Sequence, residues 1–189
     1  MSKFPFIALS LLVVASLHAA SEPKWEKLEG CTLGDTKWAD GDSFHIKNDG
    51  KDSIIRLYFV DTPEETSDQR FPDRIAVQAT YFGISSPEVL KVGDNAKDFT
   101  AKILSAAPFT VYVCGQDARG ASSQPRTYGI VETPQGNLAE LLVKNGLARI
   151  YGKKITMPNG MDSRQYEAKL QKLEQEAKQK KAGGWAKAQ

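Results

Sequence analysis

Five charged side chains in three short segments carry the chemistry that this sequence could perform. Asp42 comes first, Arg56 is followed closely by Asp61 and Glu64, and Arg126 lies much further along the chain. Carboxylate oxygens are the ligands that a hard divalent cation prefers, and a further carboxylate can activate a water. Guanidinium groups match the oxygens of a phosphate through paired hydrogen bonds. The set therefore indicates metal-assisted cleavage of a phosphodiester bond.

The segments around these residues predict how they are positioned. Two stretches rich in β-forming residues surround a tight-turn signal, Asn-Asp-Gly at 48–50, which predicts a hairpin. Its second strand carries Arg56 and ends at Asp61, where a side chain can leave the sheet and meet a ligand. Pro63 ends the strand and fixes the turn that holds Glu64. A purely structural ion pair between Arg56 and one of these acids is the alternative interpretation.

Helices become more frequent in the second half of the chain. Apolar periodicity and alternation predict helices over 74–82, 94–105, 137–146 and 163–181, and strands over 109–114 and 127–132. Strands thus come first and helices are concentrated later. This order predicts an α+β fold in which a small barrel carries helices on one side.

The first 20 residues form a segment of their own. Lys3 supplies a positive charge, residues 4–17 are almost entirely apolar, and His-Ala-Ala follows at 18–20. The pattern is typical of a secretory signal peptide and is too short for a comfortable membrane span. A retained N-terminal anchor helix is the alternative, because the cleavage site is imperfect. Export predicts a secreted or periplasmic protein with no membrane contact after cleavage.

The remaining residues, 21–189, have the length of a single domain with its own core. The formal net charge is +2, and loss of Lys3 lowers it to +1. So small a charge does not favour tight nonspecific binding to nucleic acid, so any such binding must come from a local site. The only histidines are His18 and His45. A catalytic triad or a zinc site built on histidine is therefore unattractive.

Two cysteines, Cys31 and Cys114, lie in or beside predicted strands. In an exported protein such a pair is often oxidised, and a Cys31–Cys114 disulfide could join the first strand to a later one. Two buried free thiols are the alternative.

Several short motifs follow one another in a characteristic order. They are Asp42-Ser-Phe, Arg56-Leu, Asp61-Thr-Pro-Glu64, Arg126, Leu138…Leu142-Val-Lys-Asn-Gly-Leu-Ala148, and a lysine-rich amphipathic helix followed by Trp185. This order resembles the thermonuclease (staphylococcal nuclease-like) family over about residues 29–185. The Asp-Thr-Pro-Glu run after an arginine-bearing strand is its most specific part.

The resemblance implies an OB-type five-stranded β-barrel with about three helices packed on it. It implies a monomeric endonuclease that hydrolyses DNA and RNA, uses Ca²⁺ as cofactor and leaves a 3′-phosphate. It also assigns roles to individual residues. Calcium would be held by Asp42, Asp61 and the backbone carbonyl of Thr62, water would be activated by Glu64, and the scissile phosphate would be held by Arg56 and Arg126.

The chain departs from the family pattern in three places. The Tyr-Gly pair at 128–129 follows Arg126, whereas in the family such a pair precedes the arginine. Arg119 is therefore a rival, although the spacing to the helix that follows favours Arg126. The stretch 69–92 is longer than usual. Near Tyr151 only one aromatic residue remains where several are expected, so stacking with bases could be weaker.

Two further functions fit parts of the pattern. A catalytically inactive OB-type nucleic-acid-binding module would keep the barrel and lose the chemistry. Such a module should lose its acids first, because carboxylates repel phosphate when no metal is present. A calcium-stabilised structural domain of the cell envelope would need Asp42 and Asp61 but would leave Arg56 and Arg126 without a task. The retained acids and arginines favour the enzyme.

Overall fold

A computed structural model describes residues 23–35, 39–66, 72–120 and 122–187. The signal peptide expected at 1–20 lies outside the described residues. Within the described ranges, no helix has the length and apolar character needed to cross a membrane.

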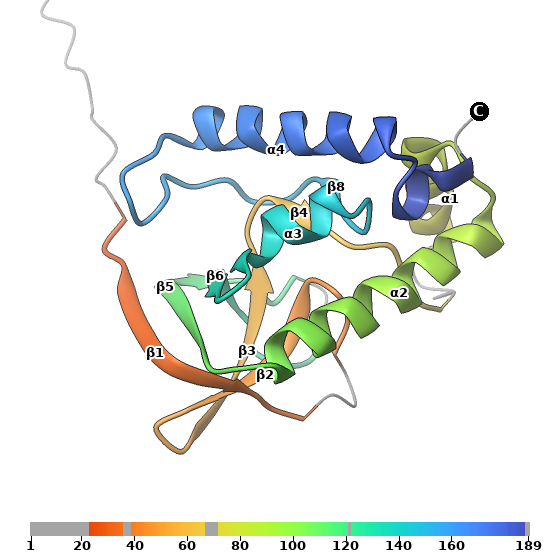
Figure 1. The fold of residues 1–189 in the computed structure, drawn as a ribbon. Helices are drawn as coiled ribbons and strands as arrows, with labels where there is room; N and C mark the ends of the chain where they lie inside the picture. The colour runs from red at the N-terminus through yellow and green to blue at the C-terminus, as the bar shows by residue number, and fades with distance from the viewer. Residues whose placement is uncertain (1–22, 36–38, 67–71, 121, 188–189) are drawn as a thin grey trace, which may run out of the picture.

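The centre of the molecule is a closed, mixed β-barrel (Figure 1). Its strands are β1 (Glu26–Leu33), β2 (Ser43–Asn48), β3 (Lys51–Leu57), β5 (Phe109–Asp117) and β6 (Thr127–Thr133). Antiparallel pairing gives the order β3-β2-β1-β5-β6, and parallel pairing of β3 with β6 closes the barrel, as at Ile55 and Thr127. The predicted OB-type fold is confirmed, including the β2–β3 hairpin with its turn at 48–50.

Three very short strands lie outside this barrel. β7 (Gly136–Asn137) continues the sheet beside β6, and β4 (Val60–Asp61) pairs with β8 (Arg149–Ile150). The β4–β8 pairing is antiparallel and sets Asp61 opposite Arg149. This small pair fixes the end of the arginine-bearing strand against a distant part of the chain.

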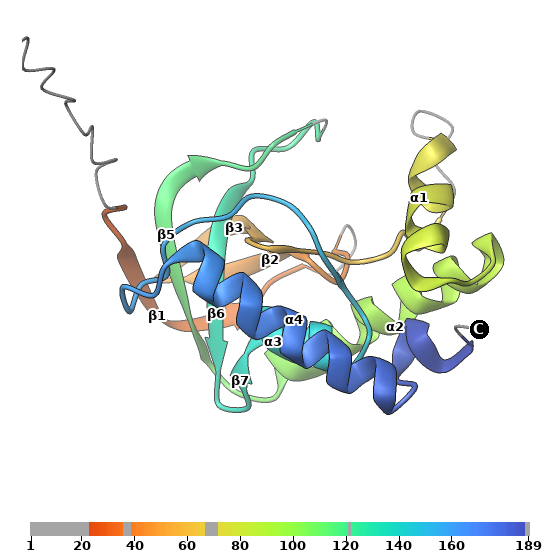
Figure 2. The same ribbon diagram turned by 90° about the horizontal axis from the view of Figure 1, so that it is seen from above.

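Among the described residues, four helices and a short 3₁₀ turn accompany the barrel, one helix more than the resemblance implies. They are α1 (Pro72–Phe82), α2 (Ser86–Ser105), α3 (Leu138–Lys144), α4 (Ser163–Gln179) and η1 (Gly183–Lys187). In Figure 1 they lie above the barrel and to its right, and Figure 2 shows α4 crossing above α3.

The helix boundaries follow local signals. Asn137 caps α3 by accepting from the backbone of Glu140 at 3.2 Å, as the sequence predicts. The predicted start of α2 at Asp94 is wrong, because the helix begins at Ser86. A Ser-x-x-Glu capping pair, in which Ser85 N donates to Glu88 over 2.9 Å, provides the earlier start. The long stretch at 69–92 thus contains α1 and the first part of α2.

Apolar side chains fill the barrel, and α2, α3 and α4 cover it. The core includes Phe44, Ile46, Ile55, Leu57, Val111, Ile130, Leu138, Leu142, Tyr166 and Leu170, all almost fully buried. A second cluster joins Phe82 of α1, Ala177 of α4 and Trp185 of η1. Trp185 folds back onto α1, with its ring centroid 4.8 Å from that of Phe82.

The predicted disulfide is wrong, because both cysteines are free. Cys31 pairs with Phe109 in the β1–β5 ladder, so Cys114 lies five residues further along β5, roughly 16 Å away at ~3.3 Å per residue. A disulfide needs Cα atoms about 6 Å apart. The register of the two strands therefore excludes the bridge.

Candidate active site

The predicted acids and one predicted arginine meet where β3 ends. Nη2 of Arg56 lies 3.2 Å from Oδ1 of Asp61 and 3.5 Å from Oδ2 of Asp42. Both aspartates are almost completely buried, with 1% and 2% of their surface exposed. The Arg56–Asp61 ion pair that the sequence left as a structural alternative therefore exists, but as part of a larger cluster.

The β2–β3 ladder brings Asp42 to this place. Ser43 pairs with Arg56 across the ladder, and Leu57 N donates to Asp42 O over 2.8 Å. The loop before β2 is pressed against α2, where the Thr100 hydroxyl donates to Gly41 O over 2.8 Å. A Cβ at Gly41 would lie 2.7 Å from the Thr62 side chain, so only glycine allows this close approach.

The turn after β4 joins the same cluster. Thr62 N donates to Oδ2 of Asp42 over 3.3 Å, which ties the two predicted cation-binding segments together. Glu64 follows Pro63, and its Oε1 lies 2.8 Å from Nε of Arg74. Five of the six predicted site residues therefore lie around one point or contact residues that do, namely Asp42, Arg56, Asp61, Thr62 and Glu64.

Helix α1 supplies two site residues that the sequence reading missed. Nη2 of Arg74 lies 2.8 Å from Oδ1 of Asp61, so its guanidinium bridges Asp61 and Glu64. Gln78, which is fully buried, hydrogen-bonds Asp61 and the backbone of Thr62 and Glu64. Their spacing of four residues places them on one helical face and was the available signal.

Arg149 of β8 is the third missed residue. Its Nε donates to Oδ2 of Asp61 over 2.8 Å, and its guanidinium lies 4.3 Å from the ring centroid of Tyr151. Both oxygens of Asp61 are thus engaged by arginines. The signal in the sequence was a charged residue within an apolar run at 147–150.

Arg126 lies at the entry to β6, on the other side of Arg56. Its Nη1 donates to the Ser43 hydroxyl over 3.2 Å, and its Nη2 donates to Arg119 O over 3.1 Å. Its Nε is buried and has no hydrogen-bond partner among the described residues. The rival Arg119 offers its backbone carbonyl to this group, whereas Arg126 contacts Ser43, which pairs with Arg56 across the β2–β3 ladder.

A cavity of about 220 Å³ opens beside these groups. Its lining includes three carboxylates and one cation of the cluster, namely Asp40, Asp42, Glu64 and Arg74, together with Thr62, Pro63, Glu65 and Lys97. Lys97 is paired with Glu65 at 2.7 Å. The cavity is polar and is bounded by the two loops that carry Asp42 and Glu64.

Burial shifts the pKa values of the acids at this cavity. Burial, followed by the negative charge of Asp42, raises the pKa of Asp40 well above its usual value. Burial also raises the pKa values of Asp42 and Glu64, while Arg56 and Arg74 respectively oppose the change. Burial, and then the positive charge of Arg56, lowers the pKa of Arg126. Burial thus outweighs the neighbouring opposite charges, both for the acids and for Arg126.

The oxygen atoms at this cavity are of the chemical type that a hard cation prefers. Among the described residues, however, no three His, Cys, Asp or Glu side chains are already grouped so that they could hold a metal ion. Carboxylate oxygens and a backbone carbonyl are what Ca²⁺ prefers, and it accepts waters at its other positions. Asp42 and Thr62 line the cavity, and Thr62 O keeps a lone pair after accepting from Gln78. A cation there would favour the ionised forms of the buried acids.

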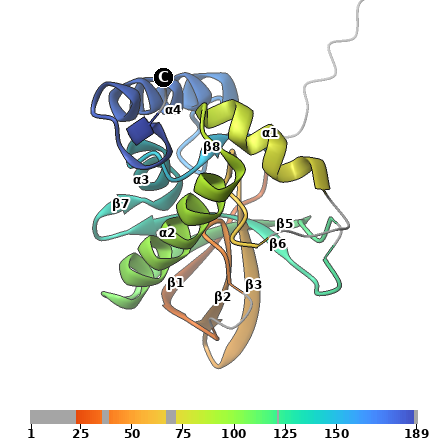
Figure 3. The same cartoon turned by 90° about the vertical axis from the view of Figure 1, so that its right-hand side faces the viewer.

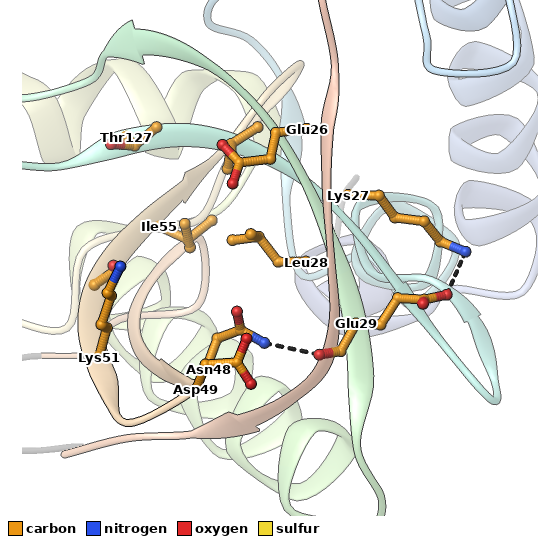
Figure 4. Close-up of a pocket in the computed structure, with 11 residues that line it drawn as sticks. Glu26, Lys27, Leu28, Glu29, Asn48, Asp49, Lys51, Ile55 and Thr127 are labelled. Carbon is orange, nitrogen blue, oxygen red and sulfur yellow. Dashed lines mark hydrogen bonds and ion pairs between the residues drawn. The ribbon is translucent and has the colours of Figure 1, made fainter.

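A larger cavity of about 570 Å³ lies elsewhere, between β1, the β2–β3 turn, three residues of β3 and single residues of β5 and β6 (Figure 4). Its polar groups largely satisfy one another, since Lys27 pairs with Glu29 and the Asn48 amide donates to Glu29 O over 2.7 Å. None of the predicted site residues lines it. Size alone therefore does not mark the functional site.

Comparison with known proteins identifies the family of the chain. Residues 54–187 match the sequence model of a family described as staphylococcal nuclease homologue. The match covers well over half of the chain and includes the β3 arginine, the turn at 61–64 and the C-terminal helices. A search of curated proteins found no match.

Proposed function

The chain belongs to the staphylococcal nuclease homologue family, and on that premise we propose that it is an exported, calcium-dependent endonuclease. Membership of the family indicates a nuclease that acts on nucleic acid. The proposed reaction is hydrolysis of phosphodiester bonds in DNA and RNA to products with a 3′-phosphate. The observation that carries the proposal is the convergence of Asp42, Arg56, Asp61 and Glu64 beside one polar cavity.

Asp42, Asp61 and the carbonyl of Thr62 are the proposed ligands of the cation. When bound, calcium offsets the negative charge that develops as water attacks the phosphate. The protein contributes fixed ligand orientations, because Asp42 is held by Thr62 N and Arg56, and Asp61 is held by Arg149. Ligands held by outer hydrogen bonds in this way are typical of functional cation sites.

Glu64 is the proposed general base. It lines the cavity, and burial raises the pKa of its carboxyl, which makes the carboxylate a better proton acceptor. Arg74 opposes this shift and fixes the carboxylate through its 2.8 Å contact. The side chain can therefore orient a water in the cavity and take its proton.

Arg56 and Arg126 are the proposed phosphate-binding residues. Arg56 is balanced by two acids, whereas Arg126 has a buried Nε without a partner among the described residues. Burial, and then the positive charge of Arg56, lowers the pKa of Arg126, and an anion between the two guanidinium groups would relieve their repulsion. A phosphodiester supplies such an anion and accepts paired hydrogen bonds from arginine.

An inactive nucleic-acid-binding module remains the second candidate. It gains support from the barrel and from the arginines, but Asp40, Asp42 and Glu64 at the same cavity would repel a phosphate unless a cation lies between them. The acids therefore favour the enzyme over the binding module.

A nuclease assay on purified residues 21–189 tests the proposal. We expect single-stranded DNA and RNA to be cleaved in millimolar Ca²⁺ and to survive when a chelator is present. Products with a 3′-phosphate should be extended by a polymerase only after phosphatase treatment. Binding of DNA without any chelator-sensitive cleavage would instead support the inactive module.

The location of the protein is a separate part of the proposal. We expect residues 1–20 to be removed as a signal peptide, so that a monomer is released to the periplasm or the medium. Mass spectrometry of the exported protein and its sedimentation in solution test both points. Full-length protein retained in the membrane fraction would support an N-terminal anchor instead.

A further inference from the structure

Gln78 is the most completely buried polar residue at the site, with 0% of its surface exposed. Burying a primary amide is costly unless its donors and its acceptor find partners. Its amide contacts the turn that follows β4, and Figure 3 shows α1, the helix that carries it, alongside β8, to which Tyr81 of the same helix hydrogen-bonds. The hydrogen-bond partners of this amide therefore indicate which part of the site Gln78 holds in place.

Among the described residues, the hydrogen-bond partners of the Gln78 amide all lie within the four residues 61–64. Its Oε1 accepts from Glu64 N at 3.0 Å, and its Nε2 donates to Asp61 Oδ2 and to Thr62 O, each at 3.2 Å. Both amide hydrogens and one oxygen lone pair are thus used. One side chain contacts each of the three residues that the proposed mechanism needs from this turn.

The turn depends on such outside support. Pro63 has no N–H to donate, and the β4 strand that precedes it is only two residues long. Ladder hydrogen bonds therefore cannot fix the orientation of Thr62 O or of the Glu64 backbone by themselves. The amide of Gln78 supplies the missing contacts and also holds one oxygen of Asp61.

Helix α1 can serve as a firm support because its other end is anchored. One turn beyond Gln78, the Tyr81 hydroxyl donates to the buried Glu174 of α4 and accepts from Ile150 N at 3.2 Å. Phe82 packs against Trp185 in the adjoining apolar cluster. On the same face, Arg74 holds the carboxylate of Glu64.

We propose that Gln78 is a positioning residue of the nuclease reaction, which aligns Asp61, Thr62 and Glu64 through its side-chain amide. The proposal rests on the proposed function, since it assigns a task to Gln78 within that reaction. It acts through the turn and makes no contact with substrate. Its loss should therefore lower kcat and calcium affinity while leaving KM for nucleic acid nearly unchanged.

Gln78→Met is the first test, because methionine is similar in length but cannot hydrogen-bond the turn. We expect kcat to fall about 10- to 100-fold, as is typical when a residue that orients ligands is lost, and KM to change by less than about threefold. Calcium affinity, measured by calorimetry, should weaken in parallel. Gln175→Ala is the matched control, since this glutamine is exposed on α4 and should behave as wild type.

Gln78→Glu gives a sharper version of the test. An ionised glutamate still accepts from Glu64 N, but it cannot donate, so it faces Asp61 Oδ2 and Thr62 O with negative charge. We expect a larger loss of kcat than for Gln78→Met. Equal kcat for the two variants would contradict the assigned donor roles.

Amide hydrogen exchange in metal-free protein separates local positioning from a general loss of stability. In Gln78→Met the Glu64 amide should exchange faster, whereas the amide of Leu57, which donates to Asp42 O, should not change. If Gln78→Met proves unfolded, Gln78→Asn keeps the amide on a shorter stem, and the same local loss of protection is expected.

The outcomes are distinguishable. Wild-type protein without chelator-sensitive cleavage defeats the proposed function, and the positioning role with it. Active wild-type protein and a folded Gln78→Met variant with unchanged kcat and calcium affinity overturn the positioning role alone. A fall in kcat that is accompanied by faster exchange throughout the barrel shows a structural role and also overturns the proposal.

Discussion

Arg149 donates from Nε to Oδ2 of Asp61 over 2.8 Å, although the two residues are 88 positions apart. They face one another in the two-residue pairing of β4 with β8, and both are almost fully buried. The same carboxylate also contacts Arg56 and Arg74 through its other oxygen. This acid is therefore the point at which three segments of the chain are joined.

Arg149→Ala should destabilise the fold. Removal of one partner from a buried ion pair costs ~3–5 kcal/mol, and we expect about 3 kcal/mol because Arg56 and Arg74 remain. Urea denaturation in the presence of chelator measures the free energy of unfolding. Lys154→Ala is the control, since its exposed pair with Glu167 should contribute less than about 1 kcal/mol. Equal effects of the two substitutions would contradict the assigned importance of the buried pair.

Glu64→Gln and Arg126→Lys should each reduce activity without unfolding the protein. Each removed contact is worth roughly 3 kcal/mol in the transition state, which corresponds to a loss of about 100-fold or more in kcat. Lysine keeps the positive charge but lacks the planar guanidinium that can donate two parallel hydrogen bonds to phosphate oxygens, so Arg126→Lys should not preserve activity. Steady-state kinetics in saturating calcium check this, with circular dichroism to verify folding. Full activity of Arg126→Lys would show that charge alone suffices at this position.

Gly93→Ala should be harmful, although alanine usually stabilises a helix by about 1 kcal/mol relative to glycine. A Cβ at Gly93 of α2 would lie 2.3 Å from Glu64 O and 2.7 Å from Pro63 O, so the turn must move. We expect a loss of about 1–3 kcal/mol in the free energy of unfolding, together with lower kcat. The exposed Asn95→Ala on the same helix is the control and should be neutral or slightly stabilising.

Asp40→Asn should change how stability depends on pH when calcium is chelated. Because burial and the charge of Asp42 raise the pKa of Asp40, the folded state holds this proton more tightly than the unfolded state does. Wild-type stability should therefore decline as pH rises from about 4, the pKa of an unfolded aspartate, to the higher pKa of the folded state. Asparagine cannot ionise, so the variant should lack this decline. The difference in the free energy of unfolding, variant minus wild type, should therefore be larger at pH 8 than at pH 4.

Unfolding curves in chelator at the two pH values test this sign. Asp94→Asn, at an exposed position on α2, controls for the loss of one negative charge. A constant difference between Asp40→Asn and wild type at both pH values would contradict the raised pKa.

Both cysteines should titrate as thiols in denatured protein that has never been reduced. In the folded protein Cys31 should react slowly with a thiol reagent, because it is completely buried and burial raises the pKa of its thiol. Cys114 is only half-buried and should react faster. Ellman titration before and after denaturation measures both. Absence of thiols in the unreduced, denatured protein would show that they are bridged after all.

Much of the fold follows from short-range patterns. The Asn-Asp-Gly turn at 48–50, the strand that carries Arg56 and the cap at Asn137 all depend on residues within a few positions of one another. Hydrogen bonds of turns and caps close over three or four residues, so the amino-acid types suffice to predict them. The predicted start of α2 is too late, because the capping pair at Ser85 lies well before the apolar stripe on which the prediction of this helix depends.

The cysteines show where short-range patterns end. Each lies on the strand expected of it, yet the register of β1 against β5 separates them. Register is decided by which side chains face the core along the whole strand and by bulges such as the one between Leu28 and Cys31. Neither is visible in the spacing of two residues.

The sequence by itself indicated Asp42, Arg56, Asp61, Glu64 and Arg126 as candidate site residues, because their order along the chain resembles that of one family and because turn and strand signals surround them. It did not indicate Arg74 or Arg149. Only the tertiary structure decided which side chains contact the carboxylate of Asp61. Gln78 and Arg149 reach Asp61 from 17 and 88 positions away, through the packing of α1 and the pairing of β4 with β8. Such contacts form only when distant elements pack together, so local residue preferences cannot specify them.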